Sequence, residues 1–251
     1  MGALSLTDPW ALLAVAVALS LGGILKGATG AGLPVISVPV LASLYDVRVA
    51  VAVMVLPNLV TNLNQVRKFR AHAVHPAFVR RLAISGALGA GVGTLALAWL
   101  PVAVVEAVMV CLIVAFIALR LTRPDLRLSQ AIADRWVWLA GGTGGILQGA
   151  VGISAPVAVT FLSSMALPRP QFIVTVSAFF AATCVIQLPV QIHYGIMTVD
   201  TALLGLFALI PLTAAVPVGE WIGQRFSAAM FDRVILLFLG ALAVKLLLDL
   251  V

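Results

Sequence analysis

The stretch "GGILKGATGAGLPV", Gly22 to Val35, decides the fold predicted for this chain. It holds five glycines, one proline and one lysine inside a long apolar region. Glycine and proline interrupt helices, and a lysine in apolar surroundings needs a partner or a wet cavity. The stretch therefore predicts a helix that is broken inside an apolar environment, and the composition says which environment this is.

The composition is that of an integral membrane protein. Hydrophobic residues make up 63% of the 251 residues and charged residues 10%, and the mean hydropathy is +1.17. A soluble domain of this size needs more polar surface. The apolar stretches are filled on every face with Leu, Ala and Val, without the two-residue alternation of a membrane β-barrel. We therefore predict an all-α polytopic membrane protein. Stretches that lack Asp, Glu, Lys and Arg over the roughly 18 residues that indicate a span include 49–66, 82–105, 136–168, 170–199 and 201–219.

The quoted stretch recurs 122 residues later as "GGILQGAVGISAPV", Gly144 to Val157, with nine of fourteen positions identical. The same shift aligns Thr61 with Thr183 and Gln65 with Gln187. We predict two repeats of one design, residues 1–122 and 136–251, joined by a polar cytoplasmic linker, 123–135, in one membrane domain. Each repeat is expected to hold a Gly-broken helical hairpin and three transmembrane helices. The expected segments are 10–44 (helices over 10–25 and 33–44), 48–66, 82–100 and 103–121, then 136–167, 171–193, 200–222 and 234–250.

The basic residues predict how the repeats are oriented, because cytoplasmic connections of membrane proteins are enriched in Lys and Arg. If each broken segment enters and leaves on the same side, twelve basic residues lie in the cytoplasm and only Arg48 and Lys245 lie outside. Single crossings throughout would move Arg169, Arg225 and Arg233 outside as well. The hairpin arrangement makes the repeats inverted, as in many secondary transporters, with both termini outside. The first ten residues lack the basic leader of a signal peptide. We expect a multi-pass protein of the bacterial cytoplasmic (inner) membrane.

Each break also predicts a place where an anion binds. Non-helical backbone at membrane depth must be buried in protein or line a wet cavity. The helices that restart near Pro34 and Pro156 present free amides and the positive end of a helix dipole. We expect the two tips to face one another near the middle of the membrane, although such glycines also serve close helix packing. The candidate residues at the tips are Thr29, Gly30, Gly32, Gly152 and Ser154.

Polar side chains in the apolar segments complete the predicted site. Lys26 is the only charged residue at this depth, which suits an anionic substrate, whereas the alternative is an ammonium that reaches the membrane surface. The following span of each repeat carries a polar stripe at helical spacing, and these groups could instead join helices to one another. The candidate side chains are Lys26, Asn58, Thr61, Asn62, Gln148, Thr183 and Gln187, and the stripes also include Gln65 and Gln191.

Several functions are disfavoured by the residues present. No phosphate-binding loop of the GxxxxGK[ST] type occurs, so we expect no ATP hydrolysis and infer no ATPase subunit. Cys111 and Cys184 have no metal-ligand spacing, and no hydrolytic triad can form at one depth, so we predict neither an enzyme nor a cofactor or metal. The basic connections report topology rather than nucleic-acid binding. Glu220 is expected to pair with Arg225 at the membrane surface. The predicted partners are a small anionic substrate and the lipid bilayer, and a homo-oligomer is compatible with the sequence.

The segments "TGAGLPVISVPVL" (Thr29 to Leu41) and "VGISAPVAVTFL" (Val151 to Leu162) resemble the paired signatures of the sulfite exporter TauE/SafE family of membrane permeases. The first is similar to the family's GxGxxxxxxP pattern through Gly30, Gly32 and Pro39, and the second to its GxxGPP pattern through Gly152 and Pro156. Leu33 replaces a frequent third glycine, and Ser154-Ala155 replace a Gly-rich pair.

The resemblance extends over nearly the whole chain and implies a permease for small anions, often sulfur-containing ones such as sulfite, thiosulfate or a sulfonate. With the repeat architecture, it predicts alternating access to a site at mid-membrane. Two alternatives stay open, an anion channel and a transporter of a small non-sulfur carboxylate. The sequence determines neither the direction of transport nor a coupling ion.

Overall fold

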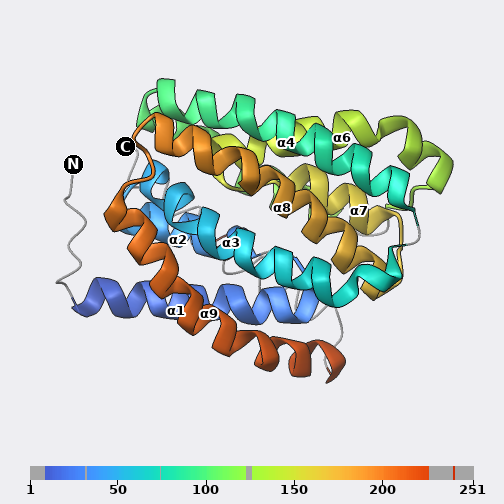
Figure 1. Ribbon diagram of the computed structural model, residues 1–251, viewed down its shortest axis with the longest axis horizontal. Helices are drawn as coiled ribbons and strands as arrows, with labels where there is room; N and C mark the ends of the chain where they lie inside the picture. The colour runs from blue at the N-terminus through green and yellow to red at the C-terminus, as the bar shows by residue number, and fades with distance from the viewer. Residues whose placement is uncertain (1–8, 32, 74, 123–125, 226–239, 241–251) are drawn as a thin grey trace.

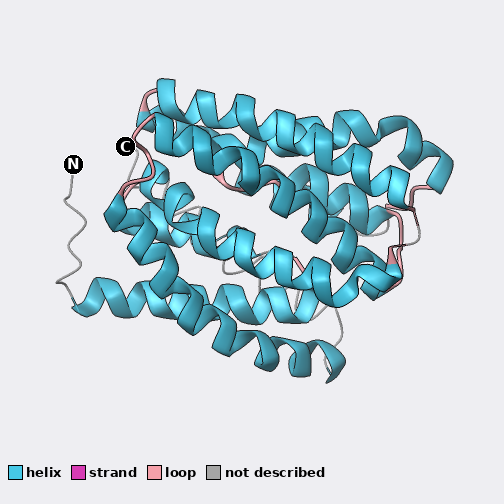
Figure 2. Ribbon diagram, viewed as in Figure 1, coloured by secondary structure: helices cyan, strands magenta, loops and turns pink. Residues whose placement is uncertain are grey.

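The chain is helical throughout the part that the structure describes. This computed structural model describes residues 9–31, 33–73, 75–122, 126–225 and 240, and no strand occurs among them (Figure 2). Five helices in these ranges are long and apolar enough to cross a membrane. The prediction of an all-α polytopic membrane protein is therefore confirmed. The predicted last span, 234–250, lies outside the described residues except for Gly240.

The elements follow one another with short connections. Their order is α1 (Pro9–Thr29), α2 (Leu33–Leu44), α3 (Val47–Phe69), the 3₁₀ turn η1 (Arg70–His72), α4 (Pro76–Trp99), α5 (Val102–Thr122), α6 (Gln130–Val151), the π-helical turn η2 (Ala155–Val159), α7 (Thr160–Ser164), α8 (Arg169–His193) and α9 (Val199–Arg225).

Local sequence signals start several of these helices. The Asp46 carboxylate accepts a hydrogen bond from the Val49 amide at 2.9 Å and caps α3. Proline in the first turn of α4 and of α8 costs nothing, because the first amides of a helix have no intrahelical acceptor. At the other end of α4, the Arg48 side chain donates to the carbonyls of Leu97 (3.0 Å) and Leu100 (2.8 Å).

The bundle has two ends, which differ in the charged side chains that lie there. At the basic end, α3 and α9 finish and α4, α6 and α8 begin. There Lys68 of α3 pairs with Glu220 of α9 at 3.2 Å. The expected pair of Glu220 with Arg225 is wrong, because the Arg225 guanidinium lies over the Trp221 ring instead, 4.2 Å from its centroid. The end where α3 begins, near Arg48, is called the opposite end below.

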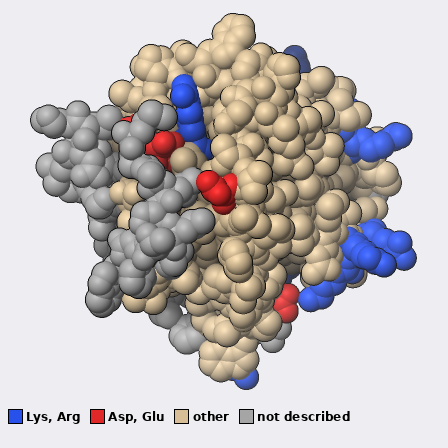
Figure 3. All heavy atoms as spheres, turned by 60° about the vertical axis from the view of Figure 1, so that its left-hand side comes forward, with Lys and Arg blue, Asp and Glu red and all other residues tan. Residues whose placement is uncertain are grey.

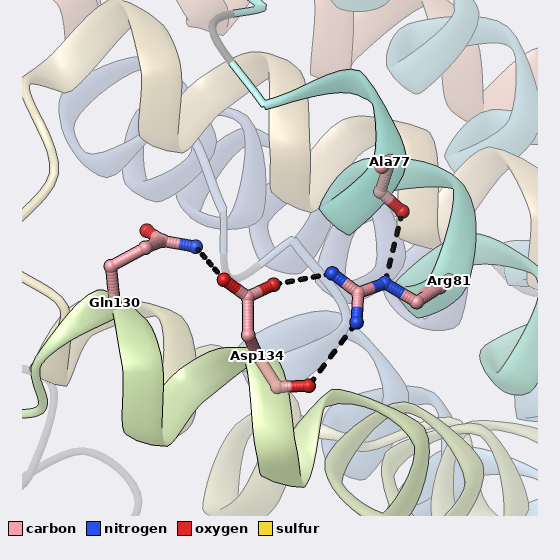
Figure 4. A network of polar contacts seen from close by, with 4 residues as sticks. All are labelled: Ala77, Arg81, Gln130 and Asp134. Atoms are coloured by element: carbon pink, nitrogen blue, oxygen red, sulfur yellow. Dashed lines mark hydrogen bonds and ion pairs between the residues drawn. The ribbon is translucent and has the colours of Figure 1, made fainter.

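Helices α4 and α6 begin earlier than predicted, at Pro76 and Gln130 rather than at residues 82 and 136. The charged residues that mark these boundaries in the sequence pair with one another near the starts of the two helices. Arg81 forms an ion pair with the Asp134 carboxylate and also donates to the Asp134 carbonyl at 3.3 Å (Figure 4). Gln130 donates to the same carboxylate at 3.2 Å. Charge at these positions therefore extends the helices instead of ending them.

Glycines join the helices in two closely packed pairs, α1 with α9 and α4 with α6. A Cβ on Gly27 would lie 2.9 Å from the Glu220 amide, and a Cβ on Gly219 would overlap the Ile24 backbone. Helix α1 therefore continues through its glycines to Thr29, and the predicted end at residue 25 is wrong. Glycine is tolerated there because the neighbouring helix occupies the space of a side chain. In both pairs the contacting residue numbers rise together, so the paired helices are parallel.

The helices sort into two packing groups. The first group is α1, α2, α3 and α9, and the second is α4, α6, η2, α7 and α8, with α5 beside η2 and α6. Figure 1 shows the first group in the lower half of the view and the second in the upper half. The main contact between them is α3 on α8. Among the described helices, the first group thus takes α9 from the second half of the sequence, and the second group takes α4 from the first half, with α5 of the first half beside it.

Candidate functional site

The structure contains both predicted breaks, and they fall on equivalent glycines. Gly30 ends α1 with φ +80°, and Gly152 ends α6 with φ +71°. Left-handed backbone of this kind favours glycine, because a side chain would be strained there. The two amides donate to the carbonyls of Lys26 (2.7 Å) and Gln148 (3.0 Å), which closes each helix. Gly32, also predicted for the site, lies outside the described residues.

The two glycines do not face one another. Gly152 lies near the opposite end, where a Cβ on it would contact Val51 of α3 at 3.2 Å. Gly30 packs on Ile173, early in α8 and therefore toward the basic end. Lys26, one turn before Gly30, reaches Asn62, eleven residues from Val51 and hence about 16 Å along α3. The prediction that the tips meet is wrong, because α1 runs on past residue 25.

The helices that follow the breaks begin closer to the middle. Leu33, the first residue of α2, lies 3.0 Å from where a Cβ on Gly22 would be, about two turns before the end of α1. In the second half, Ala158 of η2 lies 2.7 Å from a Cβ placed on Gly144. The amides of residues 153–155 have no hydrogen-bond acceptor in the described part of the chain. They are the free donors expected at a helix start.

Lys26 lies on α1 between Gly22, where α2 begins alongside, and Gly30, where α1 ends. Lys26 is 2% exposed, and its ammonium donates to the Asn62 side-chain oxygen at 2.8 Å. The Asn62 amide nitrogen donates to the Asn58 side-chain oxygen at 2.6 Å and to the Asn58 carbonyl at 2.7 Å, which holds Asn62 in this orientation. An ammonium has three donors, and Asn62 takes one. Among the residues described, no carboxylate pairs with Lys26.

Helix α8 supplies the facing side of the site. Cys184 is buried beside Asn58 and within electrostatic range of Lys26. One turn further, the Gln187 amide nitrogen donates to the backbone carbonyl of Gln148 on α6 at 3.2 Å. The side-chain oxygens of Gln148 and Gln187 are buried without a partner in the described residues, as is the Ser154 hydroxyl. Helix α8 thus places Cys184 beside the polar groups of α3, and the unpaired side-chain oxygens of Gln187 and Gln148 follow one turn further along.

Three predicted residues use their hydroxyls locally. Thr29 donates to the Leu25 carbonyl at 2.9 Å, Thr61 to the Pro57 carbonyl at 2.7 Å and Thr183 to the Phe180 carbonyl at 2.8 Å. A hydroxyl bonded to the preceding turn of its own helix supports or bends that helix. Thr29 also accepts from the Ala31 amide at 3.2 Å, so it fixes the turn at Gly30.

Two residues outside the predicted set of candidate side chains are also buried in this part of the structure, although Gln191 was already named on the polar stripe. Gln191 is fully buried, and neither atom of its side-chain amide has a partner among the described residues. Its place on the polar stripe, four residues after Gln187, was the available signal. Cys184 stands 122 residues after Asn62, so the repeat already aligned it with a site residue.

The outer surface fits a lipid environment. Large apolar side chains such as Leu88, Ile210 and Phe207 are well exposed. On the face drawn in Figure 3, Lys, Arg, Asp and Glu form a few small groups on an otherwise uncharged surface. The polar residues of the site are therefore enclosed by a shell that faces hydrocarbon.

The comparisons with known proteins identify the family of the chain. The family model described as "Sulfite exporter TauE/SafE" matches residues 14–246, nearly the whole chain. No curated protein and no solved structure shows significant similarity to this chain. The match includes both broken segments, the polar stripes of α3 and α8, and Lys26. The chain therefore belongs to the sulfite exporter TauE/SafE family, a family of membrane transporters.

Proposed function

We propose that this protein is a permease that carries a small anion, in particular a sulfur-containing oxyanion, through a site at the crossing of α3 and α8. The observation that carries the proposal is the buried ammonium of Lys26, hydrogen-bonded to Asn62 and without a carboxylate partner in the described residues. A buried charge is costly unless it is paired, so a bound anion is the natural counterion.

The rest of the site favours moderate affinity. Asn58 and Asn62 present neutral amides beside Lys26, Gln187 of α8 is hydrogen-bonded to Gln148 of α6, and free backbone amides follow Gly152. One full charge gives selectivity for anions, and neutral groups orient the oxygens without holding them too tightly for release. The family description "sulfite exporter" supports a sulfur oxyanion as the cargo.

Uptake into liposomes that contain the purified protein tests the proposal. We expect saturable uptake of sulfite or thiosulfate, competed by small sulfonates. If only small carboxylates move, the sulfur assignment is wrong. If large single-molecule currents replace saturable exchange, the protein is a channel. If no anion in the panel moves, the proposed function itself is wrong.

We further propose that the two packing groups move against one another and expose the site to each side in turn. Parallel pairing of α1 with α9 and of α4 with α6 supports an exchange of equivalent helices between inverted repeats. Arginines bridge the groups at both ends. Arg169 of α8 donates to the Gly27 carbonyl of α1 at 2.9 Å, and Arg48 of α3 donates to carbonyls at the end of α4. We propose that the basic end, which holds the basic connections, is cytoplasmic.

Removing the bridge at the basic end should open that side. Cys184 reports the opening, because its thiol is buried in the site, and Cys111 is exposed and can be replaced. In a Cys111→Ser background, Arg169→Ala is expected to raise the labelling rate of Cys184 at least about fivefold for a charged thiol reagent added to the basic end. The reason is that two hydrogen bonds between the groups are lost.

Arg80→Ala is the matched control, since Arg80 is exposed at the same end and has no recorded partner in the described residues. Its labelling rate should equal that of the parent. An Arg169→Ala variant that transports but labels at the parent rate would contradict the proposed opening.

A further inference from the structure

We infer that the preferred substrate carries a hydrogen-bond donor, an O–H or N–H group, in addition to its negative charge. This inference rests on the proposed function, because it concerns the same site. Its basis is a set of buried polar groups that lack partners among the described residues, of which the side-chain oxygens of Gln148 and Gln187 can only accept hydrogen bonds.

Gln187 gives the clearest case. Its amide nitrogen donates to the Gln148 carbonyl at 3.2 Å, and turning the amide over would place two oxygens against one another. The orientation is therefore fixed, and the side-chain oxygen is left as a buried acceptor without a partner in the described part of the chain. The residue is 1% exposed, so open solvent does not satisfy this oxygen. A buried acceptor of this kind is destabilising until a donor reaches it.

Other unpaired groups lie on the same side of the site. The Gln148 side-chain oxygen and the Ser154 hydroxyl are buried without partners in the residues described, and so are both amide atoms of Gln191. Gln191 lies one turn beyond Gln187 on α8. All four residues belong to the second half of the sequence, whereas the cation comes from the first half. Repeat alignment makes the contrast direct, because Gln148 occupies the position equivalent to Lys26.

The spacing suits a small two-ended ligand. Cys184 lies within electrostatic range of Lys26, and Gln187 follows it by three residues, or about 4.5 Å along the helix axis. On this proposal, an anion with its charged group at Lys26 directs a donor at its other end toward the Gln187 oxygen. A protonated oxyanion or a short hydroxysulfonate has this form, and a sulfonate with an alkyl tail does not.

Two sulfonates of equal charge and chain length test the inference. Ethanesulfonate and 2-hydroxyethanesulfonate differ by one hydroxyl group. As competitors of sulfite uptake into liposomes, we expect the hydroxylated compound to inhibit at a concentration about tenfold lower, the effect of one hydrogen bond to a buried acceptor. Equal inhibition by the two compounds would overturn the inference, because the acceptors are then satisfied by water alone. The proposed function would stand in that case, since it fails only if no anion is transported.

Two variants test whether the Gln187 oxygen accepts the hydrogen bond from the substrate. Gln187→Met keeps the length of the side chain and removes the oxygen, so the ratio between the two inhibition constants should fall to about one. Gln65→Met is the matched control, because Gln65 is the repeat mate of Gln187 but accepts a hydrogen bond from Ser177 at 2.8 Å. It should keep the wild-type ratio. A Gln187→Met protein that still discriminates tenfold would show that Gln187 is not the acceptor and overturn the assignment.

Discussion

Lys26→Met is expected to lower anion uptake by between about tenfold and 100-fold, the effect of losing a charged hydrogen bond to the substrate. Methionine fills the same narrow volume without charge. Folding should be unaffected or slightly improved, because a buried ammonium without a counterion is itself unfavourable. Uptake into liposomes at equal amounts of incorporated protein measures the first effect, and thermal unfolding in detergent measures the second.

Lys68→Met is the matched control for this prediction. Its ammonium pairs with Glu220 at the basic end, and the Lys68 side chain is 57% exposed. Exposed pairs contribute little to stability, so neither uptake nor unfolding should change appreciably. If Lys26→Met transports sulfite and thiosulfate at the wild-type rate, Lys26 does not bind the substrate and the proposed site is wrong.

Gly145→Ala is expected to destabilise the protein strongly. A Cβ on Gly145 would lie 2.8 Å from the carbonyl carbon and 2.9 Å from the Cα of Gly86 on α4. Backbone atoms cannot rotate away as a side chain can, so α4 and α6 must separate. Overpacking of this kind costs about 1–3 kcal/mol, which should lower the apparent midpoint of thermal unfolding by roughly 5–10 °C.

Gly142→Ala provides the control on the same helix. A Cβ at Gly142 meets no atom within 4 Å, and alanine favours a helix over glycine by up to about 1 kcal/mol. Its unfolding midpoint should stay constant or rise. If Gly145→Ala unfolds at the same temperature as Gly142→Ala, α4 and α6 are not in backbone contact as described.

Much of the candidate site was predictable from local features. The two breaks fell on Gly30 and Gly152 because a repeated glycine before a proline-containing helix start is a backbone signal. Lys26 was singled out as the only charged residue at this depth, with a binding role and a reach to the membrane surface both open, and the structure buries it at 2% exposure. The spacing of Asn58 and Asn62 already placed both on one face of a helix.

Helix boundaries were less predictable, because contacts with segments that are distant in the sequence decide where a helix begins and ends. Gly23 and Gly27 lie inside α1 since α9 packs on them, and their sequence alone indicated a break. Likewise, the charges of Arg81 and Asp134 indicated loops, whereas the structure pairs the two residues within helices α4 and α6. In each case a contact between distant segments outweighed the local preference.

The sequence by itself determined the environment, the helical class, the two matched breaks and the presence of one cation inside an apolar segment. These follow from hydropathy and backbone geometry, which depend on neighbouring residues only. The tertiary structure decided which helices exchange between the halves, that the glycine tips lie at different depths, and that Asn62 is the partner of Lys26. Such contacts depend on how whole helices pack, and pairs 36 and 152 residues apart, Lys26 with Asn62 and Lys68 with Glu220, exist only once that packing has formed.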